Sequence, residues 1–375
     1  MRQLIRWTPI AVCAAFVLCA AAPAGAVEFG SAREVSFAAA SQWMVFETGD
    51  WVKVEKGRVR FHAADGAQRH VFNLRGKEHM VGTPGAAVVG ILVYADQQPM
   101  TLQVVRFDLY DSQGQRVLQI NKPGFSSAIV SPRGNAICGI DGAEGLPQTT
   151  LRLYDSRGRS TNVIPVEYFE GGRFSRDGSR FLFETAAGGL QVASAEGDVL
   201  YAFGDATAWD ASADGGVVAV TAGTAVRIYR GDELIGTHRW PADRGTIRAI
   251  AVSPDGHHVA ALSLTHAAVV SVDPPALVWD RGEDDPAWKL HTVDLLDGAR
   301  LVAIGADHDP GPESAARHSR SRCQIIDADG VVQHTVERKP ANWGAMFPQV
   351  RFAADGRRLI VIDRDAMTAV PISDQ

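Results

Sequence analysis

The stretch Val252-Ser253-Pro254-Asp255-Gly256, followed directly by the apolar run His257-His258-Val259-Ala260-Ala261-Leu262, decides the fold of this 375-residue chain. Asp-Gly between two apolar runs predicts a tight hairpin, because glycine adopts the positive φ of such a turn and aspartate bonds its own backbone. Turns of this kind recur along the whole chain. The clear copies end at Gly134, Gly178, Gly215, Gly256 and Gly356, and two degenerate copies end at Gly85 and Gly298.

The spacing of these seven glycines identifies the architecture. They lie 37 to 58 residues apart, and a mean in the mid-forties is the period of a four-stranded propeller blade. A second turn follows the inner hairpins, as at residues 153–158 and 326–330, and closes an outer hairpin. Because two hairpins cannot bury both of their faces alone, such units must stack around an axis. The sequence therefore predicts an all-β protein, a β-propeller of seven four-stranded blades, with six or eight blades as alternatives.

The two ends of the chain suggest how the ring closes. An N-terminal outer hairpin at residues 59–73 has no inner hairpin in phase before it, whereas the C-terminus supplies an inner hairpin at Gly356 and one more strand near residues 367–372. We expect these pieces to form one mixed blade. Such pairing of N- and C-terminal strands would remove two exposed sheet edges.

The Ser-Pro-Asp-Gly turn and the apolar strand after it resemble the repeats of TolB-like and WD-repeat-like bacterial propellers, and the similarity covers nearly all of the mature chain. The Gly-His and Trp-Asp dipeptides of typical WD repeats do not recur, since Trp209-Asp210 and Trp279-Asp280 occur singly. The resemblance implies a propeller fold and only weakly implies a binding role, because propellers that share this fold differ widely in activity.

The N-terminus predicts export. Arg2 and Arg6 precede an apolar run from Trp7 to Ala22 and a small-residue cleavage site ending at Ala26, which is the pattern of a secretory signal peptide. The run is too short for a membrane span, and Val12 and Leu18 are too bulky for lipoprotein cleavage before Cys13 or Cys19. We therefore expect a signal peptide at residues 1–26, one propeller domain at 27–375, and a periplasmic or secreted protein without a membrane span.

Strand order predicts which rim of the propeller carries function. The hairpin turns share one rim and are short, whereas long connections gather on the opposite rim, the loop-rich rim. Tryptophan is enriched at binding hot spots, so we expect apolar anchors on the loop-rich rim with a polar edge around them; packing between blades is the alternative role for the tryptophans. The predicted anchors are Trp240, Trp279, Trp288 and Trp343, and the predicted polar edge is Arg281, Asp284 and Asp285.

Catalytic chemistry has weaker support. Asp307, His308, Asp309 and His318 could ligate a metal near the channel mouth, although their spacing matches no established ligand pattern, which favours a solvated acidic loop. No nucleophile elbow, P-loop or cofactor fingerprint occurs, and the recurring Ser131, Ser175, Ser212 and Ser253 are turn residues. Removing Arg2 and Arg6 changes the formal net charge from −6 to −8, whereas nucleic-acid binding calls for a basic patch.

These observations favour a non-catalytic binding scaffold over an enzyme. We expect its partner to be a protein, a peptide or a cell-envelope component, with no cofactor and no nucleic acid. The alternative is a hydrolase or lyase in which a metal at the channel mouth activates a water.

Overall fold

The computed structural model describes residues 27–30, 32–36, 42–73, 78–82, 86–94, 104–142, 147–186, 189–204, 206–308, 320–338, 348–353, 355–363 and 366–374. Its regular structure consists of β-strands and two short 3-10 helices, η1 (Ala242–Arg244) and η2 (Asp297–Ala299). Within these ranges, no helix is long and apolar enough to cross a membrane. The predicted signal peptide at residues 1–26 lies outside them.

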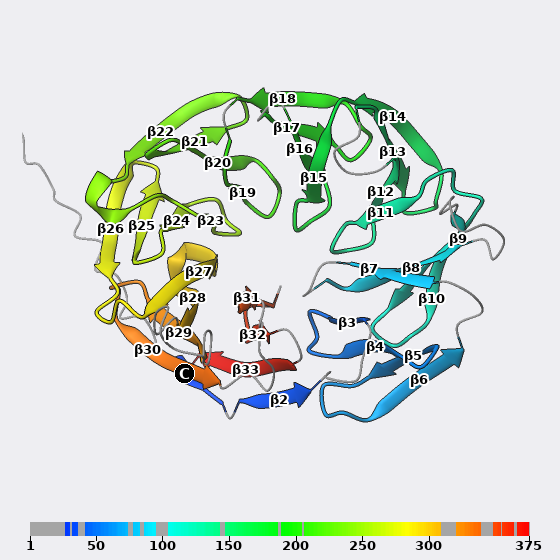
Figure 1. Cartoon of the computed structure of the whole chain (residues 1–375), viewed down its shortest axis with the longest axis horizontal. Helices are drawn as coiled ribbons and strands as arrows, with labels where there is room; N and C mark the ends of the chain where they lie inside the picture. Colours follow the sequence, from blue (N-terminus) through cyan, green and yellow to red (C-terminus); the bar gives the residue numbers. More distant parts are fainter. Residues whose placement is uncertain are drawn as a thin grey trace, which may run out of the picture.

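The strands form a ring of blades around a central opening (Figure 1), and each blade is an antiparallel sheet whose first strand lies innermost. The first four blades follow the chain in order. Blade 1 comprises β3 (Gln42–Val45), β4 (Trp51–Glu55), β5 (Arg58–His62) and β6 (Gln68–Asn73); blade 2 comprises β7 (Glu78–Val81), β8 (Val88–Tyr94), β9 (Val104–Asp111) and β10 (Arg116–Asn121); blade 3 comprises β11 (Ser127–Val130), β12 (Ala136–Asp141), β13 (Thr149–Asp155) and β14 (Ser160–Val166); blade 4 comprises β15 (Phe169–Phe174), β16 (Arg180–Thr185), β17 (Gly189–Ser194) and β18 (Val199–Phe203).

The remaining blades complete the ring. Blade 5 comprises β19 (Trp209–Ala211), β20 (Val217–Ala222), β21 (Ala225–Arg230) and β22 (Glu233–Arg239); blade 6 comprises β23 (Ala249–Val252), β24 (His258–Leu262), β25 (His266–Val272) and β26 (Pro275–Gly282); blade 7 comprises β27 (Trp288–Leu295), β28 (Leu301–His308), β29 (Ser321–Asp327) and β30 (Val332–Arg338); blade 8 comprises β31 (Gln349–Phe352), β32 (Arg358–Asp363) and β33 (Ala366–Asp374), together with β1 (Val27–Phe29) and β2 (Arg33–Ser36).

The propeller therefore has eight blades, and the prediction of seven was wrong. The sequence reading missed the inner hairpin of blade 1, formed by β3 and β4. Its turn reads Thr48-Gly49-Asp50, with glycine and aspartate in the reverse order. Gly49 has a φ of +80° and its N–H donates to the Phe46 carbonyl at 2.9 Å, just as the Gly256 N–H donates to Ser253. The turn has the geometry of the other copies without their sequence.

The ring closes through N- and C-terminal strands, but not through the predicted pair. The hairpin at residues 58–73 belongs to blade 1, and blade 8 takes its outer strands from β1 and β2. Val27 pairs with Asp374 and Phe29 with Ile372, and β2 pairs with the first half of β33. In Figure 1 the blue N-terminal β2 lies beside the red C-terminal β33. The last sheet is thus built from both ends of the chain.

The turn serines stabilise the inner hairpins. The Ser253 Oγ accepts the His258 N–H at 2.9 Å and donates to the Asp255 carboxylate, and Ser131, Ser175 and Ser212 each accept the N–H five residues later. Neighbouring turns are also joined by hydrogen bonds. Ala87 donates to Pro132, Asp177 to Ala213, Ala213 to Pro254, and Gly298 to the Asp255 carboxylate. The recurring serines are therefore structural, as predicted, and this rim is rigid.

Replacing Ser253 with alanine is expected to lower the free energy of unfolding by about 1–3 kcal/mol, because loss of the buried hydroxyl removes the acceptor of the His258 N–H. Urea unfolding followed by tryptophan fluorescence measures the change. Ser156→Ala is the matched control, since Ser156 is exposed in an outer-hairpin turn. Equal midpoints for the two variants would show that the hydroxyl does not stabilise the turn.

Strand order places the hairpin turns on one rim of the ring. The first-to-second and third-to-fourth strand turns share the short-turn rim, because antiparallel strands alternate in direction. The largest sequence separations between consecutive strands join β8 to β9, β12 to β13, β22 to β23, β28 to β29 and β30 to β31, and the described ends of these strands lie on the loop-rich rim. Other connections on this rim are short: residues 167–168 separate β14 from β15, and residues 283–287 separate β26 from β27. That the loop-rich rim carries function stays a prediction.

Candidate functional site

Three of the predicted anchors are buried. Trp240 is 3% exposed, Trp279 is 8% exposed and Trp288 is 4% exposed. Trp240 packs in a core between blades 5 and 6, and the other two pack in a core between blades 6 and 7. In this structure none of the three presents its ring to a partner, and their burial matches the packing role. Trp343 lies outside the described residues.

Trp279 shows why sequence reasoning misplaced these rings. It lies within the outermost strand β26 and not in a loop, because β26 continues to Gly282. A side chain at Gly330, in the outer turn of blade 7, would meet the Trp279 ring at 3.2 Å. The indole therefore fills the gap between two blades.

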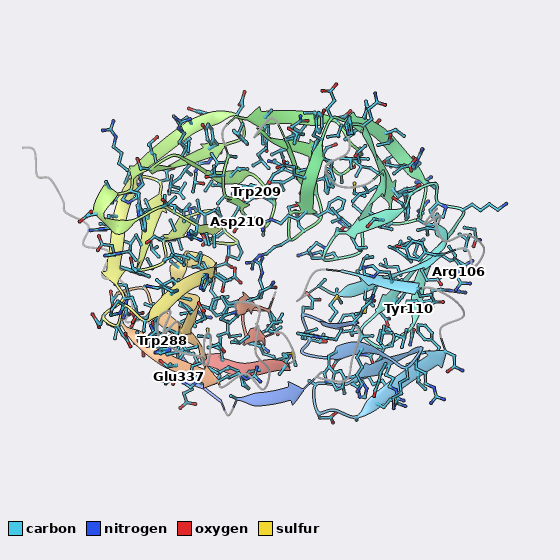
Figure 2. The ribbon with its side chains drawn as sticks, in the orientation of Figure 1. Arg106, Tyr110, Trp209, Asp210, Trp288 and Glu337 are labelled. Atoms are coloured by element: carbon cyan, nitrogen blue, oxygen red, sulfur yellow. The ribbon has the colours of Figure 1, made fainter. Side chains whose placement is uncertain are left out.

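Trp288 lies at the start of β27 beneath two arginines. The guanidinium carbon of Arg322 is 4.3 Å from the centre of the indole ring, and that of Arg320 is 5.4 Å away. Arg322 forms an ion pair with Glu283, and Arg320 forms one with Glu337. Figure 2 shows Trp288 and Glu337 in this part of the ring. Trp288 thus packs against Arg322, which in turn holds Glu283 in the connection from β26 to β27.

The predicted polar edge lies on the surface of the loop-rich rim. Arg281 is half-buried at the end of β26, and Asp284 and Asp285 are exposed in the connection at residues 283–287. The Asp285 carboxylate accepts the Ala287 N–H at 2.9 Å, and its carbonyl accepts the Trp288 N–H at 3.0 Å. Hydrogen bonds to the start of β27 therefore hold Asp285 in place.

The described metal candidates do not converge. Asp307 is hydrogen-bonded to the His291 ring, whereas the His308 ring packs edge-on against Trp288 at 5.2 Å between ring centres. The two residues are adjacent in β28, so their side chains point to opposite faces of the sheet. Asp309 and His318 lie outside the described residues. Within the described part of the chain, no group of three or more His, Cys, Asp or Glu is placed to hold a metal.

A cavity of about 740 Å³ opens at the short-turn end of the central channel. Inner turns and the ends of innermost strands line it, and every blade contributes at least one residue. Phe174, Leu182 and Phe352 give it an apolar part. Five arginines also line it: Arg133, Arg173, Arg176, Arg300 and Arg351.

Four of the charged residues at this end of the channel occupy the same position in the innermost strands of their blades. The residue two places before the first turn residue is Arg173 in blade 4, Asp210 in blade 5, Asp294 in blade 7 and Arg351 in blade 8. Each Asp uses one carboxylate oxygen to accept a backbone N–H of the next blade, from Val252 or Phe352, both at 2.7 Å. Sequence reasoning missed this pattern, although it is visible once the copies are aligned on their turns.

The arginines contact the second oxygen of each aspartate. Arg173 pairs with Asp210 and stacks on Trp209, with 4.3 Å between guanidinium carbon and ring centre. Arg176 reaches from the turn of blade 4 across the channel to Asp294 at 2.6 Å, and Arg351 lies 3.9 Å from the same carboxylate. Figure 2 shows Trp209 and Asp210 at the inner side of blade 5. The channel end therefore holds charges from blades that are not neighbours.

Burial and neighbouring charges alter ionisation in this cavity. Burial lowers the pKa of Arg173, and the positive charges of Arg351 and Arg176 lower it further while Asp210 opposes the change. The Asp294 charge raises the pKa of Arg176. Burial raises the pKa of Glu47, on the turn of blade 1, against the effect of Arg133. Three guanidinium groups are thus close enough to repel one another.

Three imidazoles away from the channel predict acid sensitivity. Burial is the largest cause that lowers the pKa of His62, His238 and His258 below the ordinary 6.5. The unfolded chain takes up protons as the pH falls through about 6.5, while the folded imidazoles stay neutral to lower pH. Proton uptake therefore favours the unfolded chain, and stability present above pH 6.5 is lost below it.

We expect the urea midpoint to fall as the pH is lowered through 6.5, and His258→Gln to reduce this dependence because glutamine does not titrate. Midpoints on either side of pH 6.5, for the natural chain and for the variant, measure the effect. A pH dependence that is identical in both would rule out a contribution from His258.

Comparison with known proteins bears on the fold. The chain matches no family model and no curated protein by sequence. Among solved structures, it is similar to the C-terminal WD40 domain of Sif2, with 9% sequence identity and a TM-score of 0.57 over 91% of this chain and 98% of that chain. It is also similar to KlHsv2 with loop 6CD replaced by a Gly-Ser linker, with 11% identity and a TM-score of 0.56 over 78% of this chain and 92% of that chain. The class defined by fold is the WD40-like β-propeller.

Proposed function

We propose that this protein is an exported, non-catalytic propeller scaffold that binds a protein, peptide or cell-envelope partner through its loop-rich rim, as a TolB-like bacterial propeller would. The observation that supports this proposal most directly is the acidic connection at residues 283–287, in which Asp284 and Asp285 are exposed. Loops on a rigid scaffold are the usual carriers of recognition. The WD40-like fold supports a binding role by analogy alone.

The packing beneath this connection supports the proposal. Glu283 pairs with Arg322 of β29, both about one-tenth exposed, and Arg322 covers Trp288. A connection held in this way loses little conformational freedom when a partner docks on it. In this proposal Arg281, Asp284 and Asp285 contact the partner directly, Trp288 supports them, and Trp343 remains a predicted anchor.

Charge reversal on each rim tests the proposal. The variant Asp284→Lys/Asp285→Lys changes the loop-rich rim, and Asp232→Lys/Glu233→Lys is the matched control, because that exposed acidic pair lies in a turn of the opposite rim. Capture from envelope and culture fractions, read by cross-linking mass spectrometry, should fall roughly tenfold for the first variant and stay unchanged for the control. Equal capture by both variants, or cross-links confined to the short-turn rim, would contradict the proposal.

Export is tested on the same preparation. Intact mass of the protein purified from its natural host should correspond to a chain that begins at Val27. A protein that retains residues 1–26 and stays in the cytoplasmic fraction would contradict export.

A further inference from the structure

The cavity at the short-turn end of the channel has the features of a ligand site and lies on the rim opposite to the proposed docking surface. Its volume of about 740 Å³ falls within the range of small-molecule pockets. The hydrogen bonds between neighbouring inner turns hold its walls in place, as from Asp177 to Ala213 and from Ala213 to Pro254, both at 2.9 Å. The site is therefore formed before a ligand arrives.

Glu47, Asp297 and Asp355 also line the cavity, but among the described residues the arginines at its centre contact only two carboxylates, those of Asp210 and Asp294. Asp210 and Asp294 each use both carboxylate oxygens, one on a backbone N–H and one on an arginine. Each guanidinium carries five N–H donors. Arg176 uses a single bond, to Asp294, and Arg351 makes no hydrogen bond to any described residue, since Asp294 lies 3.9 Å away. Unused donors of two arginines thus remain available to a ligand.

The three arginine side chains in the cavity are only partly exposed to solvent. Arg173, Arg176 and Arg351 are 34%, 30% and 38% exposed. Arg351 and Arg176 also lie close enough to Arg173 for their positive charges to lower its pKa, so each of them repels the Arg173 guanidinium. An anion between them would relieve this repulsion, and guanidinium forks match the geometry of carboxylates and phosphates.

We infer that the arginines of the channel end bind a small organic acid, with its oxyanion between Arg173, Arg176 and Arg351 and its apolar part against Phe174 and Phe352. The apolar wall distinguishes this ligand from an inorganic anion. Trp209 reports occupancy, because its ring stacks on Arg173.

Calorimetry with phenylacetate, its neutral analogue phenylacetamide, and inorganic phosphate tests the inference on the full chain. We expect phenylacetate to bind at millimolar concentration and to change the fluorescence of Trp209, phosphate to bind more weakly, and phenylacetamide not to bind. Arg351→Gln should weaken phenylacetate binding at least tenfold. Arg230→Gln is the matched control, because Arg230 also makes one long ion pair, 3.6 Å from Asp273, but lies on outer strand β21.

Arg351→Gln removes only a 3.9 Å ion pair, so it should fold, and its urea midpoint checks this. Arg173→Gln gives a second, independent loss of binding. Three results would overturn the inference: phenylacetamide binds as well as phenylacetate, a folded Arg351→Gln variant binds as tightly as the natural chain, or neither anion binds. Tighter binding of phosphate than of phenylacetate would overturn the assignment of an organic acid.

Discussion

Deleting residues 27–36, which form β1 and β2, is expected to lower the free energy of unfolding by roughly 5 kcal/mol. The deletion removes about five backbone hydrogen bonds, and each contributes about 1 kcal/mol to stability. Val27–Phe29 and Arg33–Ser36 pair with almost the whole of β33. Without them blade 8 keeps three strands, and the outer edge of β33 becomes free to pair with another molecule. We expect a lower urea midpoint together with concentration-dependent association.

The measurement compares chains that begin at residue 27 and at residue 37, by urea unfolding and size-exclusion chromatography. Phe29→Ala in the longer chain is the control for side-chain loss, because it removes the ring stacked on His334 at 4.9 Å between centres and keeps the strand pairing. It should cost only about 1–2 kcal/mol, as the ring is partly buried. Equal midpoints for the two chain lengths would show that β1 and β2 do not close the ring.

Replacing Asp294 with alanine is expected to cost about 3–5 kcal/mol, the usual effect of breaking a buried ion pair. The Asp294 side chain is 0% exposed and joins three blades, because it contacts Arg176 of blade 4, Arg351 of blade 8 and the Phe352 N–H. Its removal leaves the buried Phe352 N–H and the Arg176 guanidinium without an acceptor, and Arg351 loses its nearby negative charge. Thermal and urea unfolding should both show the loss.

Asp210→Ala is the matched control for this prediction. Asp210 occupies the equivalent position and makes the equivalent bond to Val252, but its side chain is 12% exposed and its arginine comes from a neighbouring blade. We expect a smaller loss of stability there. Asp294→Asn should fall between the natural chain and Asp294→Ala, because the amide oxygen can still accept the Phe352 N–H. An unchanged midpoint in Asp294→Ala would show that the cross-channel contact contributes nothing to stability.

Local sequence patterns predicted the direction of the strands but not the burial of the tryptophans. Strand alternation assigns the hairpin turns to one rim, because chain direction in an antiparallel sheet is a local property, whereas the role of the opposite rim stays a prediction. The tryptophans were a harder problem, since an indole at the end of a strand can face solvent or the next blade. The structure buries Trp240, Trp279 and Trp288, and only contacts between blades could have decided this.

By itself the sequence determined the all-β class, the propeller, the hairpin turns and the structural role of the turn serines, because these depend on residue type and on spacing of a few residues. Tertiary structure alone decided the number of blades, the strands that close the ring and the charged end of the channel. The turn of blade 1 has the backbone geometry of the other turns although Gly49 comes before Asp50, so its sequence does not reveal it. Strand β1 pairs with β33, from the opposite end of the chain, and no local pattern predicts this pairing. Arg176 and Asp294 lie 118 residues apart, and their contact exists only because eight blades around one axis bring them together.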